Sequence, residues 1–338
     1  MFKINKNIKN KSKEPRTFFS VSLKDNVSSL CISIPKILKF YPHAKYFLIC
    51  RQVDKDFFHS KLPKNNRIIF ISEESLISYV NFTILFKKIS KTSKISRGTT
   101  SKHLSWYYQQ ALKLTFVLNE QNSKSFFPAV MFDADSILLK KIDFFSDINN
   151  SILYGSLSER HCDYFKSLDV LFKHYNYPTL GFTTQFFSTT YSEMKVLKTQ
   201  MKKKYLKYGK IKIEDLVTYV ILESTLIAHG KLNGSKFSEQ ELVGVSNTLN
   251  SIHKKQIPII SFRSWVLFGI VTSLQMKFLS CFGVTLLTYE NRISFKSKEL
   301  SWFSFLRFFI SDIKPQIQKL IKIQLKYILF KLFKKERV

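Results

Sequence analysis

Two carboxylates interrupt an apolar run in the middle of the chain, and they constrain the fold more than any other feature. The run extends from Val130 to Leu139, and Asp133 and Asp135 stand inside it, separated by one residue. An apolar strand has no structural reason to end in two acids, whereas a strand end that holds a divalent cation beside a diphosphate does. Mg²⁺ and Mn²⁺ are commonly bound by one or two protein carboxylates, with substrate phosphates and water as the remaining ligands. In open α/β sheets such ligands bind beyond the carboxyl ends of the strands. We therefore predict a metal and nucleotide site here; the alternative is a turn whose two acids are solvated or cap the next segment.

Apolar segments before this run alternate between strand and helix spacing. Strands are predicted over residues 17–23, 45–50 and 67–71, and helices over 27–40 and 104–118. A further strand is predicted after the run, over residues 151–157. Strands that alternate with helices favour a mainly parallel sheet covered by helices on both faces. The sequence therefore predicts an α/β fold.

Composition divides the chain of 338 residues into four segments. Residues 1–15 are polar and basic and are expected to be disordered, and 16–260 hold the predicted α/β domain. Residues 261–300 are expected to form an extension of helix and strand packed on that domain, and 301–338 a basic amphipathic helix. Inside the domain, the Lys-, Ser- and Thr-rich stretch 87–102 is predicted to be a loop.

The charge of the chain favours a polyanionic partner. Lys and Arg number 54 against 24 Asp and Glu, which gives a formal net charge of +30. Nucleic acid, anionic lipid and a phosphorylated substrate all fit such an imbalance. Arg is scarce beside Lys, and neither zinc-finger spacing nor an RNA-recognition signature is present, so no nucleic acid is expected. The four Cys are far apart in sequence, as is usual for reduced thiols, and predict a cytoplasmic protein.

The last segment has a helical pattern with one apolar face. Its apolar residues recur at spacings of 4, 4, 3 and 4, while three lysines fall on the opposite side. The apolar residues are Ile317, Ile321, Leu325, Ile328 and Leu332, and the lysines are Lys319, Lys322 and Lys326. A basic amphipathic helix of this kind can lie on an anionic membrane surface, which predicts a peripheral protein on the inner face of the cytoplasmic membrane. The alternative is a helix packed on the α/β domain with a solvated lysine face. No stretch is long and apolar enough to predict a transmembrane helix.

One face of the predicted helix 104–118 combines three chemistries. Trp106, Gln110 and Lys113 stand at positions i, i+4 and i+7, so an aromatic plane, an amide and a cation share that face. Beside a metal-bound diphosphate such a face can support a base or ribose and neutralise phosphate charge. The alternative is a surface helix whose tryptophan packs inward.

Three motifs in this order resemble a family of little-characterised bacterial glycosyltransferases, related to the sugar transferases of polysaccharide and lipopolysaccharide synthesis. The first is the aromatic-x-x-Q-Q-x-x-K helix, the second is the D-x-D pair, and the third is F-S-E-x-E-L-x-G. Here they are Trp106, Gln109, Gln110 and Lys113; Asp133-Ala134-Asp135; and Phe237 to Gly244. The family usually has an aromatic residue where this chain has Gln240. The similarity covers roughly residues 17–250, including an acceptor-side segment at 177–187.

The resemblance implies a GT-A-like (Rossmann-like) fold and metal-dependent sugar transfer. The donor would be a nucleotide-sugar, and the acceptor a glycan or lipid-linked glycan of a capsule, O-antigen or lipopolysaccharide. The cofactor would be Mn²⁺ or Mg²⁺. Asp135 would coordinate the metal, and Asp133 would contact the donor ribose or share the metal. Trp106, Gln109 and Gln110 would contact the donor, and Lys113 would assist at a phosphate.

Further candidates follow from the same resemblance. Glu239 and Glu241 are candidates for the acceptor side, where a carboxylate can take the proton of the attacking hydroxyl. The alternative is a capping box, Ser238-x-x-Glu241, that begins a helix. His253 is the candidate for a third metal ligand. Two other functions stay open: a basic nucleic-acid-binding protein, and a metal-dependent phosphotransferase that uses the same two aspartates.

Overall fold

The computed structural model describes residues 13–92, 104–119, 124–158, 162–172, 178, 180–205, 211–228, 237–249, 256–265, 271–281, 284–290 and 299–335. Its strands are β1 Thr17–Val21, β2 Lys45–Cys50, β3 Ile68–Ser72, β4 Ala129–Phe132, β5 Ser136–Leu138, β6 Phe145–Asp147, β7 Asn150–Ser151, β8 Tyr154–Ser156, β9 Phe186–Thr189, β10 Ile257–Ile259, β11 Ser261–Trp265 and β12 Leu286–Glu290. Its α-helices are α2 Val27–Phe40, α3 Lys55–Lys61, α4 Tyr79–Thr92, α6 Leu104–Asn119, α7 Cys162–Ser167, α8 Tyr191–Tyr205, α9 Ile213–Ala228, α10 Glu239–Leu249, α11 Ser273–Cys281 and α12 Trp302–Lys335.

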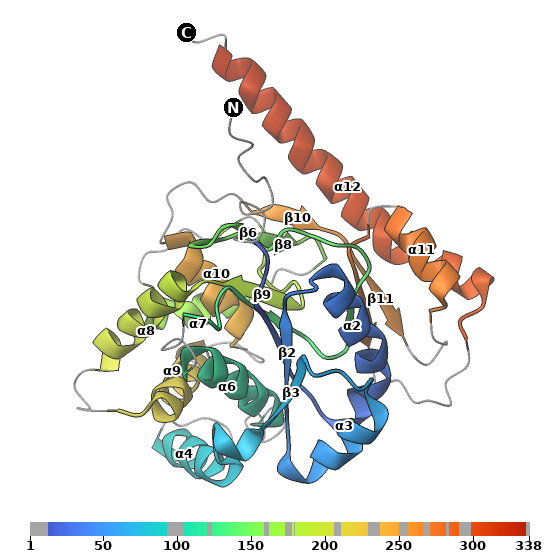
Figure 1. Cartoon of the computed structure of the whole chain (residues 1–338). Coiled ribbons are helices and arrows are strands. Elements are labelled where there is room, and N and C mark those ends of the chain that lie inside the picture. Colours follow the sequence, from blue (N-terminus) through green and yellow to red (C-terminus); the bar gives the residue numbers. More distant parts are fainter. Residues whose placement is uncertain are drawn as a thin grey trace, which may run out of the picture.

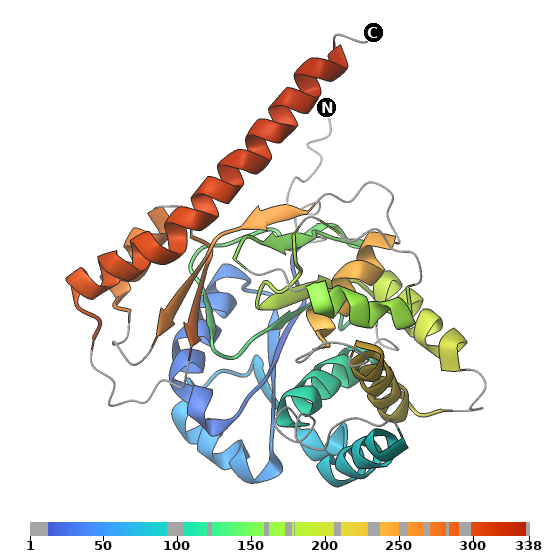
Figure 2. The same cartoon turned by 180° about the vertical axis from the view of Figure 1, so that it is seen from behind.

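A five-stranded sheet with the order β3-β2-β1-β4-β9 forms the centre of the molecule (Figure 1). β1, β2, β3 and β4 are parallel to one another, and β9 is antiparallel to β4. Helices cover both faces of the sheet: α2 and α3 lie on one side, and α4, α6 and α9 lie on the other (Figures 1 and 2). This arrangement confirms the predicted fold class, a mixed and mainly parallel sheet flanked by helices.

Alternate residues of the central strands enter two separate cores. In β1, Phe18 packs into the core under α2, whereas Phe19 packs into the core under α6. In β4, Val130 and Met131 divide in the same way. Since successive side chains of a strand point to opposite faces, a strand buried on both faces is apolar throughout. This explains why the strands appear in the sequence as continuous apolar runs.

The apolar run from 130 to 139 is divided between two strands. β4 ends at Phe132, and β5 begins at Ser136 in a different, three-stranded sheet with the order β11-β12-β5. The N–H of Ser136 donates to the carbonyl of Asp133 over 3.1 Å, which closes a turn around the two aspartates. The chain therefore changes sheets at the D-x-D pair, and both acids stand at the boundary between the sheets.

Two other predicted elements differ from the structure. The predicted strand over 151–157 is divided, because β7 pairs with β6 and β8 pairs instead with β10. The predicted loop over 87–102 begins too early, since α4 continues to Thr92, and residues 93–102 lie outside the described part of the chain. Most of the basic N-terminal segment, residues 1–12, also lies outside it.

The C-terminal helix α12 extends away from the rest of the molecule (Figures 1 and 2). Its first half packs against β11 and contributes Phe305 and Ile313 to a third core, which it shares with β5, β12 and α11. None of the helices in the described ranges is long and apolar enough to cross a membrane.

Gly244 explains the last position of the F-S-E-x-E-L-x-G motif. It faces the ring of buried Phe182, and a Cβ atom on Gly244 would overlap that ring. The glycine thus allows α10 to approach the segment that precedes β9.

We expect Gly244→Ala to lower the free energy of unfolding by about 1–3 kcal/mol, because the strain of overpacking exceeds the gain in helix propensity. Urea denaturation measures this loss. The double variant Phe182→Leu/Gly244→Ala is the control, and it should lose less than the sum of its single variants because the smaller side chain vacates the space. A Gly244→Ala variant as stable as the parent would contradict the close approach.

Candidate functional site

A cavity of about 320 Å³ opens at the carboxyl ends of β1 and β4. This volume is at the lower end of the range for small-molecule sites. α6, the turn between β4 and β5, the segment before β9 and the start of α10 contribute most of its walls. The lining residues are Asn26, Trp106, Gln109, Gln110, Lys113, Asp133, Ala134, Asp135, Tyr164, Thr183, Gln185, Ser238, Glu239, Gln240 and Thr288.

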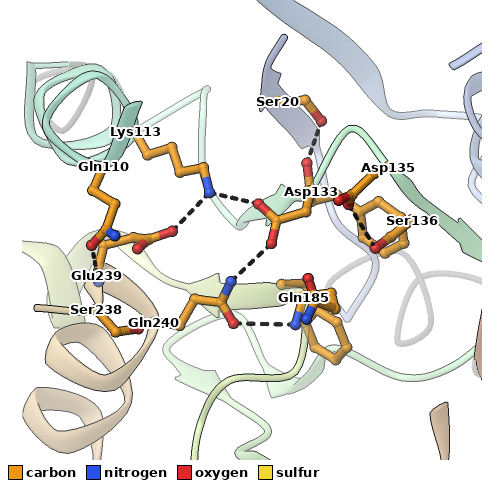
Figure 3. Close-up of polar contacts among 12 residues, drawn as sticks. Ser20, Gln110, Lys113, Asp133, Asp135, Ser136, Gln185, Ser238, Glu239 and Gln240 are labelled. Atoms are coloured by element: carbon orange, nitrogen blue, oxygen red, sulfur yellow. Dashed lines mark hydrogen bonds and ion pairs between the residues drawn. The ribbon is translucent and has the colours of Figure 1, made fainter. Parts of the chain in front are cut away.

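The buried ammonium group of Lys113 joins three elements of this cavity (Figure 3). Its Nζ atom lies 2.5 Å from Oδ1 of Asp133 and 2.8 Å from Oε1 of Glu239. Burial alone would lower the pKa of Lys113, but the two carboxylates raise the pKa above its ordinary value, so the lysine remains charged. The ion pairs thus hold together α6, the end of β4 and the first turn of α10.

Gln240 completes this network from the other side of Asp133 (Figure 3). Its Nε2 donates to Oδ2 of Asp133 over 3.1 Å, and its Oε1 accepts from the N–H groups of Thr184 at 2.9 Å and Gln185 at 3.1 Å. Backbone N–H groups only donate and a carboxylate only accepts, so the orientation of the amide is fixed. Both oxygens of Asp133 are therefore held by nitrogen donors.

Gln185 adopts a backbone conformation that is uncommon for a residue with a side chain. Its φ is +66°, and its carbonyl accepts from the N–H of Asp133 over 2.9 Å. Such conformations persist where the surroundings over-determine them, and they cluster at functional sites. Here the hydrogen bonds from Asp133 and to Gln240 stabilise a conformation that keeps Gln185 in the cavity wall.

The side-chain amide of Gln110 retains an unused donor at the cavity. Its Oε1 accepts from the N–H of Glu239 over 3.1 Å, whereas its Nε2 is buried and has no hydrogen-bond partner within the described part of the chain. A buried donor without a partner costs roughly 1–3 kcal/mol. A ligand oxygen at this position would remove that cost.

The cavity is acidic although the chain is strongly basic. Three carboxylates, of Asp133, Asp135 and Glu239, line the cavity, and Lys113 is the single Lys or Arg among its described lining residues. Burial and the neighbouring charge of Asp133 raise the pKa of Asp135 to about 7. The lining thus favours a bound cation, which would stabilise the ionised form of Asp135.

The donor set fits a hard divalent cation. Asp133 and Asp135 offer oxygen ligands, and two protein carboxylates are the usual number where substrate phosphates supply other ligands to Mg²⁺ or Mn²⁺. Within the ranges that the structure describes, no group of three or more His, Cys, Asp or Glu side chains could hold a metal ion. His253 lies outside those ranges.

The predicted site residues do not all line the cavity. Seven of them line the cavity: Trp106, Gln109, Gln110, Lys113, Asp133, Asp135 and Glu239. Glu241 is not among the lining residues. Its Oε1 accepts from the N–H of Phe182 at 2.8 Å and from Thr183 Oγ1 at 3.1 Å. Ser238 Oγ accepts from the N–H of Glu241 over 3.4 Å, as expected of the residue that caps α10.

Sequence reasoning did not name several residues of the cavity wall, above all Gln240. Gln185 lies within the predicted acceptor-side segment 177–187, but it was not named as a site residue. Gln240 stands where the resembling family usually has an aromatic residue. This difference from the family was the sign in the sequence that could have pointed to Gln240. Tyr164 was also missed; its ring stacks on that of Trp106 at a centroid distance of 6.5 Å. The two rings form an aromatic wall beside the carboxylates.

Comparisons with known proteins give matches among solved structures only. No protein-family model and no curated protein matches the chain. The chain is similar to the PaToxG glycosyltransferase, with 12% identity and a TM-score of 0.29 over 64% of this chain and 75% of that one. It is similar to an active-site mutant of LgtC, with 8% identity and a TM-score of 0.37 over 87% and 95%. It is also similar to the mannosyltransferase Ktr4p from S. cerevisiae in complex with GDP, with 14% identity and a TM-score of 0.25 over 39% and 36%.

Replacement of Lys113 by Met should lower the free energy of unfolding by about 2–4 kcal/mol at neutral pH, because the carboxylates of half-buried Asp133 and buried Glu239 lose their counter-charge. Urea denaturation at neutral pH measures this loss. Lys113→Met/Glu239→Gln should recover part of the loss; equal stability of Lys113→Met and the parent at neutral pH would contradict the network.

Replacement of Asp135 by Asn should stabilise the metal-free protein at alkaline pH. The pKa of Asp135 is raised above its unfolded value, so its ionisation disfavours the folded state increasingly between about pH 4 and 7. The variant should gain on the order of 1–2 kcal/mol at pH 8 and nothing at pH 4. Urea denaturation in the presence of a chelator tests this, and a less stable variant at pH 8 would contradict it.

Proposed function

We propose that the protein is a metal-dependent glycosyltransferase that moves a sugar from a nucleotide-sugar donor to a glycan acceptor. The observation that carries the proposal is the acidic cavity at the carboxyl edge of the sheet. Its described lining residues include three carboxylates and one lysine, although the chain has a net charge of +30. An anionic donor fits such a cavity only together with a cation. A divalent cation and a diphosphate satisfy this requirement together.

On the donor side, Asp135 and Asp133 would hold Mn²⁺ or Mg²⁺ against the diphosphate. The bound cation would neutralise the charge that develops on the leaving nucleoside diphosphate. Trp106 offers an aromatic surface at the cavity wall for the nucleoside, and the free Nε2 of Gln110 is a donor for a ligand hydroxyl or phosphate oxygen. Lys113 holds Asp133 and Glu239 in place.

On the acceptor side, Glu239 is the carboxylate that can receive a proton from the attacking hydroxyl. It lines the cavity, and Lys113 and the N–H contact to Gln110 fix its position. Glu241 has a supporting role in this proposal, since its carboxylate holds the backbone at Phe182. Following the family resemblance, the acceptor is a surface glycan, either free or carried on a lipid.

Nucleoside diphosphates should raise the melting temperature by about 5 °C in the presence of Mn²⁺ at saturating concentrations, and much less in its absence. Differential scanning fluorimetry with a panel of nucleoside diphosphates measures this. Asp135→Asn should abolish the metal-dependent shift, because the cation loses its main ligand. Asp56→Asn, which changes an exposed acid of α3, is the matched control and should retain it.

The nucleotide that gives the largest shift then selects the sugar donors for a transfer assay. Release of the nucleoside diphosphate should require Mn²⁺ or Mg²⁺ and should fall at least about 100-fold in Glu239→Gln if this carboxylate is the base. Cleavage of a phosphodiester without any sugar donor would support the phosphotransferase alternative. Equal shifts in Asp135→Asn and Asp56→Asn would contradict the proposed metal site.

A further inference from the structure

α12 has one face that is fixed to the rest of the molecule. Phe305 and Ile313 are buried in the third core. Gln316 makes two hydrogen bonds with the backbone of Ser261, and Lys319 Nζ donates to the carbonyl of Leu157 over 3.0 Å. Lys319, predicted to lie on the side opposite the apolar face, therefore faces the body of the protein.

Another face of α12 carries large apolar side chains that are at least 40% exposed. At 100° per residue they fall within an arc of about 100°. These residues, which we call the apolar stripe, are Phe303, Leu306, Ile310, Ile321 and Leu325. Phe303 is 80% exposed, Ile310 58% and Leu325 52%. Exposed apolar residues in such a row indicate an interaction surface.

The apolar stripe begins earlier than the sequence pattern indicated. Ile317, a member of the predicted face, is only partly buried and packs at the edge of the third core, whereas Phe303 and Ile310 were not predicted. The side chains of Ile328 and Leu332 lie outside the described residues. α11 packs on the first turns of α12, where the ring of Phe278 contacts those of Trp302, Phe305 and Phe309.

Charges within and beside the apolar stripe select its partner. At 100° per residue, exposed Arg307 and Lys314 fall within the same arc as the stripe, and exposed Lys322 lies beside it. Asp312 is the single acid between residues 302 and 325. α11 adds exposed Leu274 and Lys277. If a second copy of this chain covered the stripe, the cations of both helices would be brought together. An anionic lipid surface instead offers apolar depth and negative charge at once.

We propose that the apolar stripe of α12 binds the surface of a membrane that contains anionic lipids, with the helix lying in the plane of the membrane. The stripe points away from the protein body, so the helix can bind lipid while its other face stays packed on β11. This surface function goes beyond sugar transfer and does not depend on the cavity.

Vesicle flotation of the full chain tests the proposal. The chain should float with phosphatidylcholine vesicles that contain phosphatidylglycerol, and salt should weaken its binding to them. The variant Phe303→Ser/Ile310→Ser/Ile321→Ser/Leu325→Ser should bind these vesicles at least about tenfold more weakly. The control Val53→Ser/Val80→Ser/Ile84→Ser removes exposed apolar side chains elsewhere and should bind like the parent.

Three results would overturn the proposal. The parent chain could fail to float with anionic vesicles, or the variant in the stripe could float as well as the parent. Light scattering could also show a parent dimer that this variant converts to a monomer, which would make a second copy the occupant. Melting curves with Mn²⁺ and a nucleoside diphosphate verify that the variant is folded, and they separate a failure of the membrane surface from a failure of the proposed donor site.

Discussion

The contact of Lys113 with Asp133 and Glu239 is the interaction on which the candidate site depends. It joins α6 and the end of β4, where Lys113 and Asp133 are 20 positions apart, to the first turn of α10, where Glu239 is 126 positions from Lys113. Charges buried in this way cost several kcal/mol unless they are paired and hydrogen-bonded. Gln110 and Gln240 supply the additional hydrogen bonds, so the ion pairs and the amides fix the positions of the carboxylates as one unit.

The distribution of charge gives the molecule two different surfaces. Lysines and arginines give the chain its net charge of +30, whereas carboxylates predominate among the described residues that line the cavity. Ionisation of half-buried Asp135 is costly, because desolvation and the neighbouring charge of Asp133 raise its pKa. A cation at this position lowers that cost, and it makes an otherwise repulsive cavity suitable for an anionic ligand. The basic helix α12 has its own exposed apolar stripe, on the face away from the body.

Local pattern predicted β1, β2 and β3 of the central sheet well, whereas β9 was not predicted. The bounds of β2 and α2 match the predicted ranges, because apolar runs and helical spacing reflect burial of the same segments. The change of sheet between β4 and β5 was not predictable, since both halves are apolar and they differ only in the strands with which they pair. Gln240 was missed for a similar reason: its function depends on contacts with Asp133 and with the backbone at Thr184, more than 50 positions away in the sequence.

A crystal structure with Mn²⁺ and a nucleoside diphosphate would show whether the two aspartates hold a metal-bound donor. Anomalous scattering locates the metal independently of any assumption about the ligand. We expect a manganese peak within bonding distance of the Asp135 carboxylate, with a diphosphate oxygen in the same coordination shell and the Lys113 ion pairs intact. Manganese and nucleotide bound together at a place away from Asp133 and Asp135 would contradict this expectation.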